Sequence, residues 1–414
     1  MVPAARSAAG LINTTGDWPM KPTASTLEYQ RFDPASCGFP RPFAPLLPAF
    51  RWSALSLGGG DAPDPALFEG PGVRHFSRGR YALHEAYRSA GVGPAGALLA
   101  PAYHCRTMMD PALALGGAVR FYDIGSDLTP DLDSIRALLA APGVAARALV
   151  LPHYFGVEQP AALVDQLAAL CAAHGMALVE DCSHAWQLAA RRAPAARTQA
   201  GRAVVASPYK FFACEDGGVL WSAAVPSSPP ASSGMLDELR ALKRAWERSR
   251  LARQAGPPLP LPQAGRLEFG TVVAESGALP SPLYERACEQ QASLGLSRWV
   301  MRRTRLTPLI RRRREHYQQW NAAVAGLRGA RALFPELAPD CVPYMFPLEI
   351  NMPNPSFFLL KQAGLPIWRW DDMAVSGSEV AARYRTHLLH LPCHQDLTRE
   401  QMRWMTSLVA EVLA

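Results

Sequence analysis

The residue of this chain best suited to covalent chemistry is Lys210. It lies in the segment Ser207–Gly218, where neighbouring proline, tyrosine and phenylalanine side chains would withdraw an amine from water. Because desolvation disfavours the charged form, such a setting raises the nucleophilic neutral fraction of the amine. Arginine could not replace this lysine, since a guanidinium stays protonated and forms no Schiff base. The alternative interpretation is an ordinary solvated lysine beside the Gly217-Gly218 turn.

Two further segments place polar groups at the ends of predicted elements. Asp181 ends the apolar run Ala177–Asp181, and a carboxylate buried at a strand end needs a cationic partner. That partner is either a protonated pyridine nitrogen or a neighbouring Arg or His. Gly79-Arg80-Tyr81 enters a predicted helix, whose first N–H groups and Arg80 could hold a phosphate, although a plain helix start has the same pattern. A reactive lysine, an aspartate for a ring nitrogen and a helix N-terminus for a phosphate together predict pyridoxal 5′-phosphate as the cofactor.

The elements that must position these residues follow from the hydrophobic pattern. Short continuous apolar runs at 97–101, 118–123, 146–152 and 177–181 alternate with helical patterns at 81–87, 132–139 and 161–174. This alternation predicts an α/β fold with a mostly parallel central sheet covered by helices on both faces. Two more strands, at 203–206 and 218–221, flank Lys210.

The chain divides into four parts by composition. We expect an irregular N-terminal arm over 1–73, a large α/β domain over 74–222, a linker or excursion over 223–280 and a small α+β domain over 281–414. The excursion contains a charged helix at 236–254. The small domain should contain strands near 344–350 and 367–370, and a closing helix at 398–413 with a capping-box start.

Composition excludes several classes of protein. With 414 residues, 49% hydrophobic and 19% charged, the chain has an ordinary globular balance. The formal charge of +7 comes largely from arginines at 302, 303, 305 and 311–314, which we interpret as the solvated face of a helix. No nucleic-acid-binding motif accompanies them, so we expect a small-molecule substrate and no nucleic acid. The eight scattered cysteines, the absence of a signal-peptide pattern in 1–20 and the lack of a long apolar run predict a cytoplasmic protein without membrane spans or bound metal.

Five motifs resemble those of a known family. They are Gly79-Arg80-Tyr81-Ala82-Leu83, Pro101-Ala102-Tyr103-His104-Cys105, Pro152-His153-Tyr154-Phe155-Gly156, Glu180-Asp181-Cys182-Ser183-His184 and Lys210 followed by Glu215-Asp216-Gly217-Gly218. The pattern resembles the DegT/DnrJ/EryC1/StrS sugar aminotransferases, which are fold-type I pyridoxal-phosphate enzymes. The resemblance covers residues 74–222 well and the C-terminal part more loosely.

The resemblance implies a role for individual residues. Lys210 would form the Schiff base and move the proton, Asp181 would face the pyridine nitrogen, and His184 would lie near the phenolic oxygen of the cofactor. Gly79, Arg80, Tyr81 and Ser207 would hold the phosphate. Cys105 stands where the family often stacks an aromatic ring on the cofactor, so we expect His104 or Tyr103 to stack instead. From the residues alone, His184 is either a ligand contact or a structural histidine.

Three functions agree with these features. The leading hypothesis is an aminotransferase that moves an amino group from an amino acid such as glutamate to a keto-sugar nucleotide or a similar keto metabolite. The resemblance also implies a homodimer with active sites at the interface. The alternatives are another pyridoxal-phosphate reaction, such as a lyase or dehydratase, and a non-catalytic regulatory or scaffold protein. The second alternative is kept because residues 262–295 lack the family's Gly-Tyr-Asn-x-Arg-Met segment, which supplies contacts from the partner subunit.

Overall fold

The computed structural model describes residues 26–414 except positions 57, 59, 226–229, 233, 254–258 and 262–266. The stretch 1–20, for which the sequence predicts no signal peptide, lies outside the described residues. None of the helices in the described part of the chain is long and apolar enough to cross a membrane.

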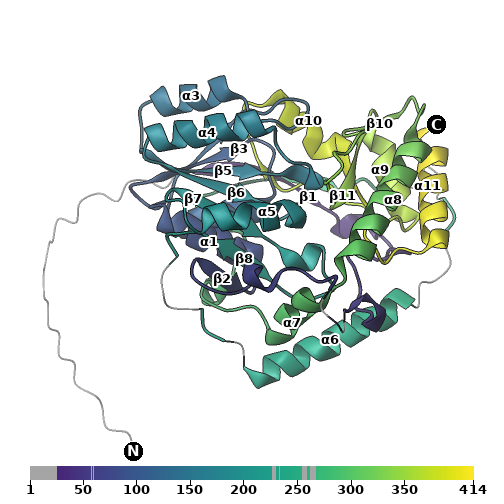
Figure 1. Ribbon diagram of the computed structural model, residues 1–414. Helices are drawn as coiled ribbons and strands as arrows, with labels where there is room; N and C mark the ends of the chain where they lie inside the picture. Colours follow the sequence, from purple (N-terminus) through teal and green to yellow (C-terminus); the bar gives the residue numbers. More distant parts are fainter. Residues whose placement is uncertain are drawn as a thin grey trace, which may run out of the picture.

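The central element of the fold is a seven-stranded sheet with the strand order β2-β8-β7-β6-β5-β3-β4 (Figure 1). Its strands are β2 (Val73–Phe76), β3 (Ala97–Pro101), β4 (Val119–Tyr122), β5 (Ala146–Pro152), β6 (Ala177–Asp181), β7 (Arg202–Ala206) and β8 (Gly218–Trp221). Strands β3 to β7 run parallel to one another, whereas β8 and β2 are antiparallel to their neighbours. The predicted α/β class and mostly parallel sheet are therefore confirmed.

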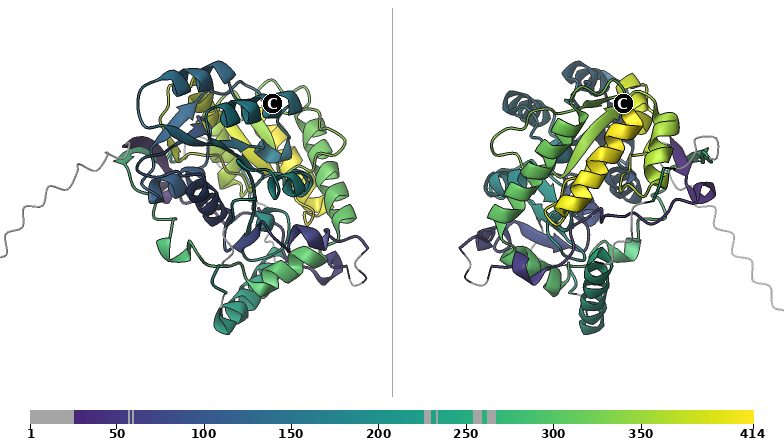
Figure 2. Two further views of the ribbon diagram at one scale, coloured as in Figure 1. Left: turned by 60° about the vertical axis from the view of Figure 1, so that its left-hand side comes forward. Right: turned by 90° about the vertical axis from the view of Figure 1, so that its right-hand side faces the viewer.

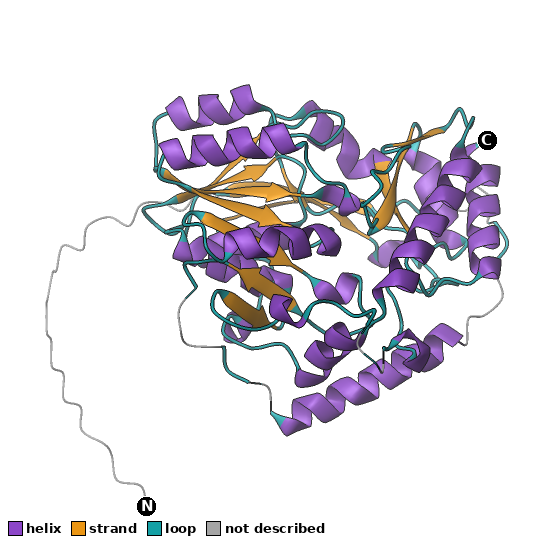
Figure 3. Cartoon of the chain, viewed as in Figure 1, coloured by secondary structure: helices purple, strands orange, loops and turns teal. Residues whose placement is uncertain are grey.

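Alternate side chains of each central strand enter two different hydrophobic cores. In β5, Ala148 and Val150 pack with α1 (Gly79–Ser89) and α2 (Arg106–Ala114). Leu149 and Leu151 point to the opposite face, which is covered by three helices (Figure 3). Those helices are α3 (Leu132–Ala140), α4 (Ala161–Ala173) and α5 (Trp186–Ala196). Because both faces are buried, the strand has a continuous apolar sequence rather than an alternating one.

The C-terminal lobe is a small antiparallel sheet packed against helices. Its strands are β10 (Ala330–Ala332), β11 (Met345–Ile350) and β13 (Leu388–Pro392), in that order. Its helices are α7 (Gly295–Arg303), α8 (Leu306–Val324), α9 (Pro353–Gln362), α10 (Glu379–His387) and α11 (Arg399–Leu413). Helix α11 crosses this sheet between α8 and α9 (Figure 2, right), and it begins with the predicted capping box of Thr398 and Gln401.

One predicted strand of this lobe is wrong. In the segment 367–370, only Trp368 forms a single bridge with His390. The next residue, Arg369, is held by Asp371 and by the carbonyl oxygen of Thr386. The chain therefore leaves the sheet after this single bridge, and residues 367–370 do not form a strand.

The N-terminal arm and the excursion meet in a third sheet. Strand β1 (Leu27–Asp33) lies between β9 (Thr271–Gly277) and β12 (Met373–Ala374), antiparallel to both. The arm that we expected to be irregular thus contains a seven-residue strand. Its partners lie more than 230 residues away in the sequence, which is why local patterns do not reveal the pairing. The predicted charged helix is α6 (Met235–Arg253).

Candidate active site

A cavity of about 390 Å³ lies between the central sheet and the C-terminal lobe, at the carboxyl ends of β5, β6 and β7. In parallel sheets this edge is where ligands bind. All but two of the residues that the sequence predicts for the site line this cavity. Those that line it are Gly79, Arg80, Asp181, His184, Ser207 and Lys210.

One end of the cavity is formed by the start of α1 and two hydroxyl groups. Helix α1 begins at Gly79, and the side chain of its N-cap residue, Arg78, makes no capping hydrogen bond. A Cβ atom on Gly79 would lie 2.1 Å from Ser207 Oγ and 3.4 Å from Ser183 Oγ. The Ser207 hydroxyl donates to Ser183 Oγ at 2.9 Å. Helix N–H groups and hydroxyls that converge in this way fit a phosphate group.

Strand β8 packs against the start of α1 at this end of the cavity. A Cβ on Gly218 would lie 2.3 Å from the carbonyl oxygen of Arg78 and 2.7 Å from the amide nitrogen of Gly79. Glycine is therefore required where β8 passes the start of α1. The carboxylate of Asp216 accepts from the N–H of Leu294, and burial raises its pKa to about 6. The Asp-Gly-Gly motif thus shapes the wall of the cavity and does not enter it.

Asp181 lies on the floor of the cavity without a cationic partner. Its side chain is buried, and Oδ1 accepts from the N–H of Ser183 at 2.9 Å. Of the residues that the structure describes, none forms an ion pair with Asp181. The neighbouring cations pair instead with Glu180, which contacts His153 at 3.2 Å and Arg202 at 2.9 Å. A buried carboxylate facing a cavity in this way fits a protonated ring nitrogen.

Lys210 ends the short 3-10 turn Pro208–Lys210 directly after β7. Its amide N–H donates to the carbonyl oxygen of Ser207 at 3.1 Å, and its Nζ lies 5.3 Å from the ring centre of Tyr344. Within the described ranges, no carboxylate lies within ion-pair distance of Nζ. The amine thus reaches the cavity from a tightly bonded backbone, with an aromatic ring rather than an anion beside it.

His184 contributes a neutral imidazole. Its Nδ1 accepts from the N–H of Phe155 at 3.3 Å, so the ring proton is on Nε2. Burial, followed by the positive charge of Lys210, holds the pKa of His184 well below its usual range. Phe155 adopts a left-handed conformation with φ of 56°, a strained geometry for a non-glycine residue. The Nε2–H group of His184 is thus free to donate, which fits the phenolic oxygen of the cofactor that the resemblance assigns to this histidine.

Two predicted cofactor contacts do not line the cavity. The buried ring of His104 stacks on Phe121, with centroids 5.0 Å apart and planes at 4°. Tyr81 points toward the loop before α7, where its hydroxyl accepts from the N–H of Glu285. The other stacking candidate, Tyr103, is also outside the cavity. Its hydroxyl is hydrogen-bonded to His390 Nε2 at 2.9 Å. Cys105, the residue directly before α2, lines the cavity in place of these two stacking candidates.

Two aromatic residues to which the sequence assigned no individual role also line the cavity. Trp370, from the C-terminal lobe, lies 5.8 Å from the His184 ring, and Tyr154 donates from its hydroxyl to the Tyr103 carbonyl. The only sequence signal for Trp370 is its position beside Arg369. Arg369 itself packs over Phe357 with its charge at 3.9 Å from the ring centre. Arg369 also lines the cavity.

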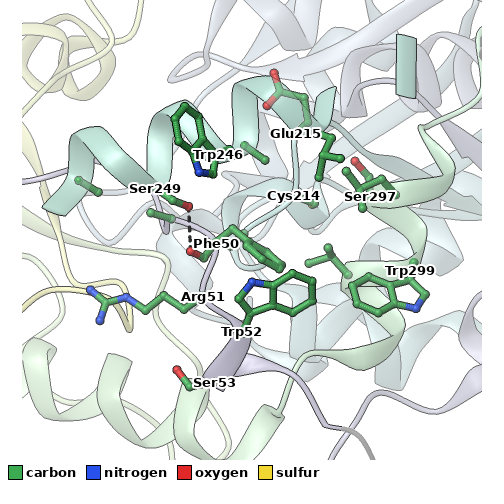
Figure 4. Close-up of a pocket in the computed structure, with 17 residues that line it drawn as sticks. Phe50, Arg51, Trp52, Ser53, Cys214, Glu215, Trp246, Ser249, Ser297 and Trp299 are labelled. Carbon is green, nitrogen blue, oxygen red and sulfur yellow. Dashed lines mark hydrogen bonds between the residues drawn. The ribbon is translucent and has the colours of Figure 1, made fainter. Parts of the chain in front are cut away.

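A second cavity, of about 450 Å³, lies behind the Lys210 loop (Figure 4). Its walls are mainly apolar and include Phe50, whose carbonyl oxygen accepts from the Ser249 hydroxyl at 2.8 Å. Its carboxylate, Glu215, is paired with Arg244 and Arg248. None of the residues predicted for the chemistry lines it, so we assign the candidate active site to the first cavity.

Residues 73–224 match the DegT/DnrJ/EryC1/StrS aminotransferase family. The central domain is therefore a DegT/DnrJ/EryC1/StrS domain. This confirms the resemblance over the segment that contains all the predicted site residues. Proteins of this family are transferases that use pyridoxal 5′-phosphate, and the match places residues 73–224 of this chain in that class. The buried Asp181, the N-terminus of α1 and Lys210 fit this cofactor.

Solved structures share the fold over most of the chain. The sugar aminotransferase CalS13 from Micromonospora echinospora is 21% identical, with a TM-score of 0.54 over 89% of this chain and 99% of that one. AtS13 from Actinomadura melliaura is 18% identical, with a TM-score of 0.55 over 90% and 99%. NtdA from Bacillus subtilis, solved with the bound cofactor PMP, is 16% identical, with a TM-score of 0.52 over 82% and 73%. The chain thus has the fold-type I architecture beyond the boundaries of the DegT/DnrJ/EryC1/StrS domain.

Proposed function

We propose that the protein moves an amino group from an amino-acid donor, glutamate, to the keto group of a nucleotide-linked sugar or a similar small metabolite. The observation that carries this proposal is one cavity that contains an amine, Lys210, and a buried carboxylate, Asp181, beside the open start of α1. The family supports the class of reaction. The description of CalS13 as a sugar aminotransferase supports the class of acceptor.

Each residue has a distinct binding role in this proposal. The N–H groups at Gly79 and the hydroxyl of Ser207 hold the phosphate. The carboxylate of Asp181 accepts from the ring nitrogen, and Nε2–H of His184 donates to the phenolic oxygen. Bound pyridoxal phosphate would supply an electron sink for the α-carbon of the donor.

Lys210 performs the proton transfer. Its Nζ would hold the bound cofactor and would be a free amine while the donor reacts. The free amine then accepts the proton of the donor α-carbon and returns a proton in the second half of the cycle. Trp370 and Tyr154 cover the cavity and limit the access of water to this amine.

The resemblance also leads us to propose a homodimer with its active sites at the interface, located in the cytoplasm. Sedimentation velocity tests the dimer, and a purely monomeric protein at micromolar concentration would contradict it.

Absorbance spectroscopy tests the function. The purified protein with pyridoxal phosphate should show a visible band that borohydride abolishes. Lys210→Ala should lose this band, whereas Lys243→Ala should keep it, because Lys243 is exposed on α6. Equal bands in both variants would refute the assignment of Lys210.

The donor half-reaction tests the type of chemistry. L-Glutamate should convert the visible band to that of the amino form of the cofactor, and a keto-sugar nucleotide should restore it. If neither glutamate nor any other amino acid changes the band, the protein does not transaminate.

A further inference from the structure

One fully buried arginine connects the C-terminal lobe to the turn that bears Lys210. Arg313 lies on α8, and its guanidinium donates to the carbonyl oxygen of Lys210 at 2.9 Å. It also donates to the carbonyl oxygens of Pro343 at 3.1 Å and Tyr344 at 3.3 Å. The sequence analysis assigned Arg313 to a solvated helix face. That assignment is wrong, because the residue is 0% exposed.

In the part of the chain that the structure describes, Arg313 forms no ion pair. Besides the three carbonyls, its Nε donates to Gln395 Oε1 at 2.9 Å, and the guanidinium lies 4.5 Å from the ring centre of Phe211. Burial lowers the pKa of Arg313 to about 10, and the nearby Asp396 carboxylate offsets only part of this effect. A buried charge whose hydrogen bonds all go to neutral acceptors costs stability, which an apolar residue of similar size would avoid. Its position therefore indicates a role other than folding.

Gln395 also binds the turn that bears Lys210. Its Nε2 donates to the carbonyl oxygen of Phe211 at 2.8 Å while its Oε1 accepts from Arg313. Two consecutive carbonyls, those of Lys210 and Phe211, are thus fixed by side chains of the C-terminal lobe. The amide of Lys210 is fixed at Ser207, so only its side chain is free to enter the cavity.

The same arginine also fixes a residue that faces the amine. Tyr344, whose carbonyl accepts from Arg313, has its ring 5.3 Å from Lys210 Nζ and 4.4 Å from the His184 ring. Arg313 therefore holds both the backbone of the lysine and the aromatic wall beside its amine.

We propose that Arg313 and Gln395 are positioning residues that direct the Lys210 amine into the cavity. The inference rests on the proposed role of Lys210. It is tested in cofactor-free protein, so that its failure is distinguishable from failure of the proposed function.

The chain is well suited to competitive labelling, because it has only four lysines. Trace acetic anhydride is added across a pH series, and peptide mass spectrometry gives the labelling of Lys210 relative to exposed Lys243. Arg313→Met should lower this ratio about tenfold at neutral pH, because the Lys210 turn loses a charge-assisted hydrogen bond. Arg313→Lys, which keeps one charged donor, should restore most of the ratio.

Arg314 offers a matched control on the same helix. It also donates to two carbonyls, those of Ala338 and Cys341, but it does not contact the Lys210 turn. Arg314→Met should leave the labelling ratio of Lys210 unchanged. A folded Arg313→Met protein with the wild-type ratio would overturn the proposal, as would an equal effect in Arg314→Met.

Gln395→Met keeps the inference testable if Arg313→Met does not fold. Loss of one neutral hydrogen bond should lower the labelling ratio by between about 2- and 10-fold. A wild-type ratio in this variant would overturn the proposal. The visible band with pyridoxal phosphate is recorded separately, and its absence in wild-type protein would refute the proposed function but not the labelling result.

Discussion

Gly218→Ala probes how strand β8 positions the start of α1. The position does not have a left-handed backbone, so alanine is locally acceptable there and only the surrounding space decides the outcome. The three nearest atoms to the added methyl group are the carbonyl oxygen and carbon of Arg78 and the amide nitrogen of Gly79, at 2.3, 2.4 and 2.7 Å. All three belong to the backbone at the helix start, and no side-chain rotation can relieve the contact.

The geometry gives the size of the effect. Ordinary contact begins at 3.4 Å, so the strand and the helix start must separate by about 1 Å. Overpacking of this kind costs roughly 1–3 kcal/mol of unfolding free energy. A shift of that size also weakens at least one charge-assisted hydrogen bond to the phosphate, worth about 1.5–3 kcal/mol. We therefore expect the Kd for pyridoxal phosphate to rise by about 10- to 100-fold.

The assay measures urea unfolding and cofactor titration for wild type, Gly218→Ala and the control Gly377→Ala. Gly377 has no atom within 4 Å of an added Cβ and an ordinary backbone conformation. The control should match wild type in both measurements. If Gly218→Ala binds pyridoxal phosphate with wild-type affinity, the start of α1 does not hold the phosphate and our account of that end of the cavity is refuted.

Two carboxylates give further predictions. Asp181→Asn keeps an acceptor for the Ser183 N–H but loses the negative charge. We therefore expect the cofactor to bind, while its conversion by glutamate slows on the order of 10²–10³-fold in stopped-flow absorbance. The control Asp165→Asn, at an exposed position, should convert at the wild-type rate. Burial raises the pKa of Asp216 from 3.8 to about 6, so the folded protein binds more protons than the unfolded chain in that window, and stability falls as pH rises through it. Relative to Asp216→Asn, wild type should lose up to roughly 3 kcal/mol of unfolding free energy between pH 4 and pH 7 in urea titrations, and a gain over the same range would contradict the burial argument.

Much of the site could be predicted because its parts are local in sequence. Parallel strands end at one edge of the sheet, so polar residues that follow β5, β6 and β7 must gather there whatever the details of packing. Asp181 and Ser207 are such residues, and Lys210 follows only three positions later. The glycine at the start of α1 and the Asp-Gly-Gly segment are likewise short-range patterns, with steric reasons that the structure makes explicit.

The remaining features depend on contacts between distant segments. Sequence periodicity placed Arg313 on a helix, but only the packing of α8 against the Lys210 turn, 103 residues away, decided that its charge is buried. Tertiary packing also brought Trp370 into the cavity and left His104 stacked on Phe121 outside it. A hydrophobic pattern records which positions are buried within an element. The side of the element that faces another lobe is determined by shape complementarity over the whole fold, because close packing admits few arrangements of the side chains.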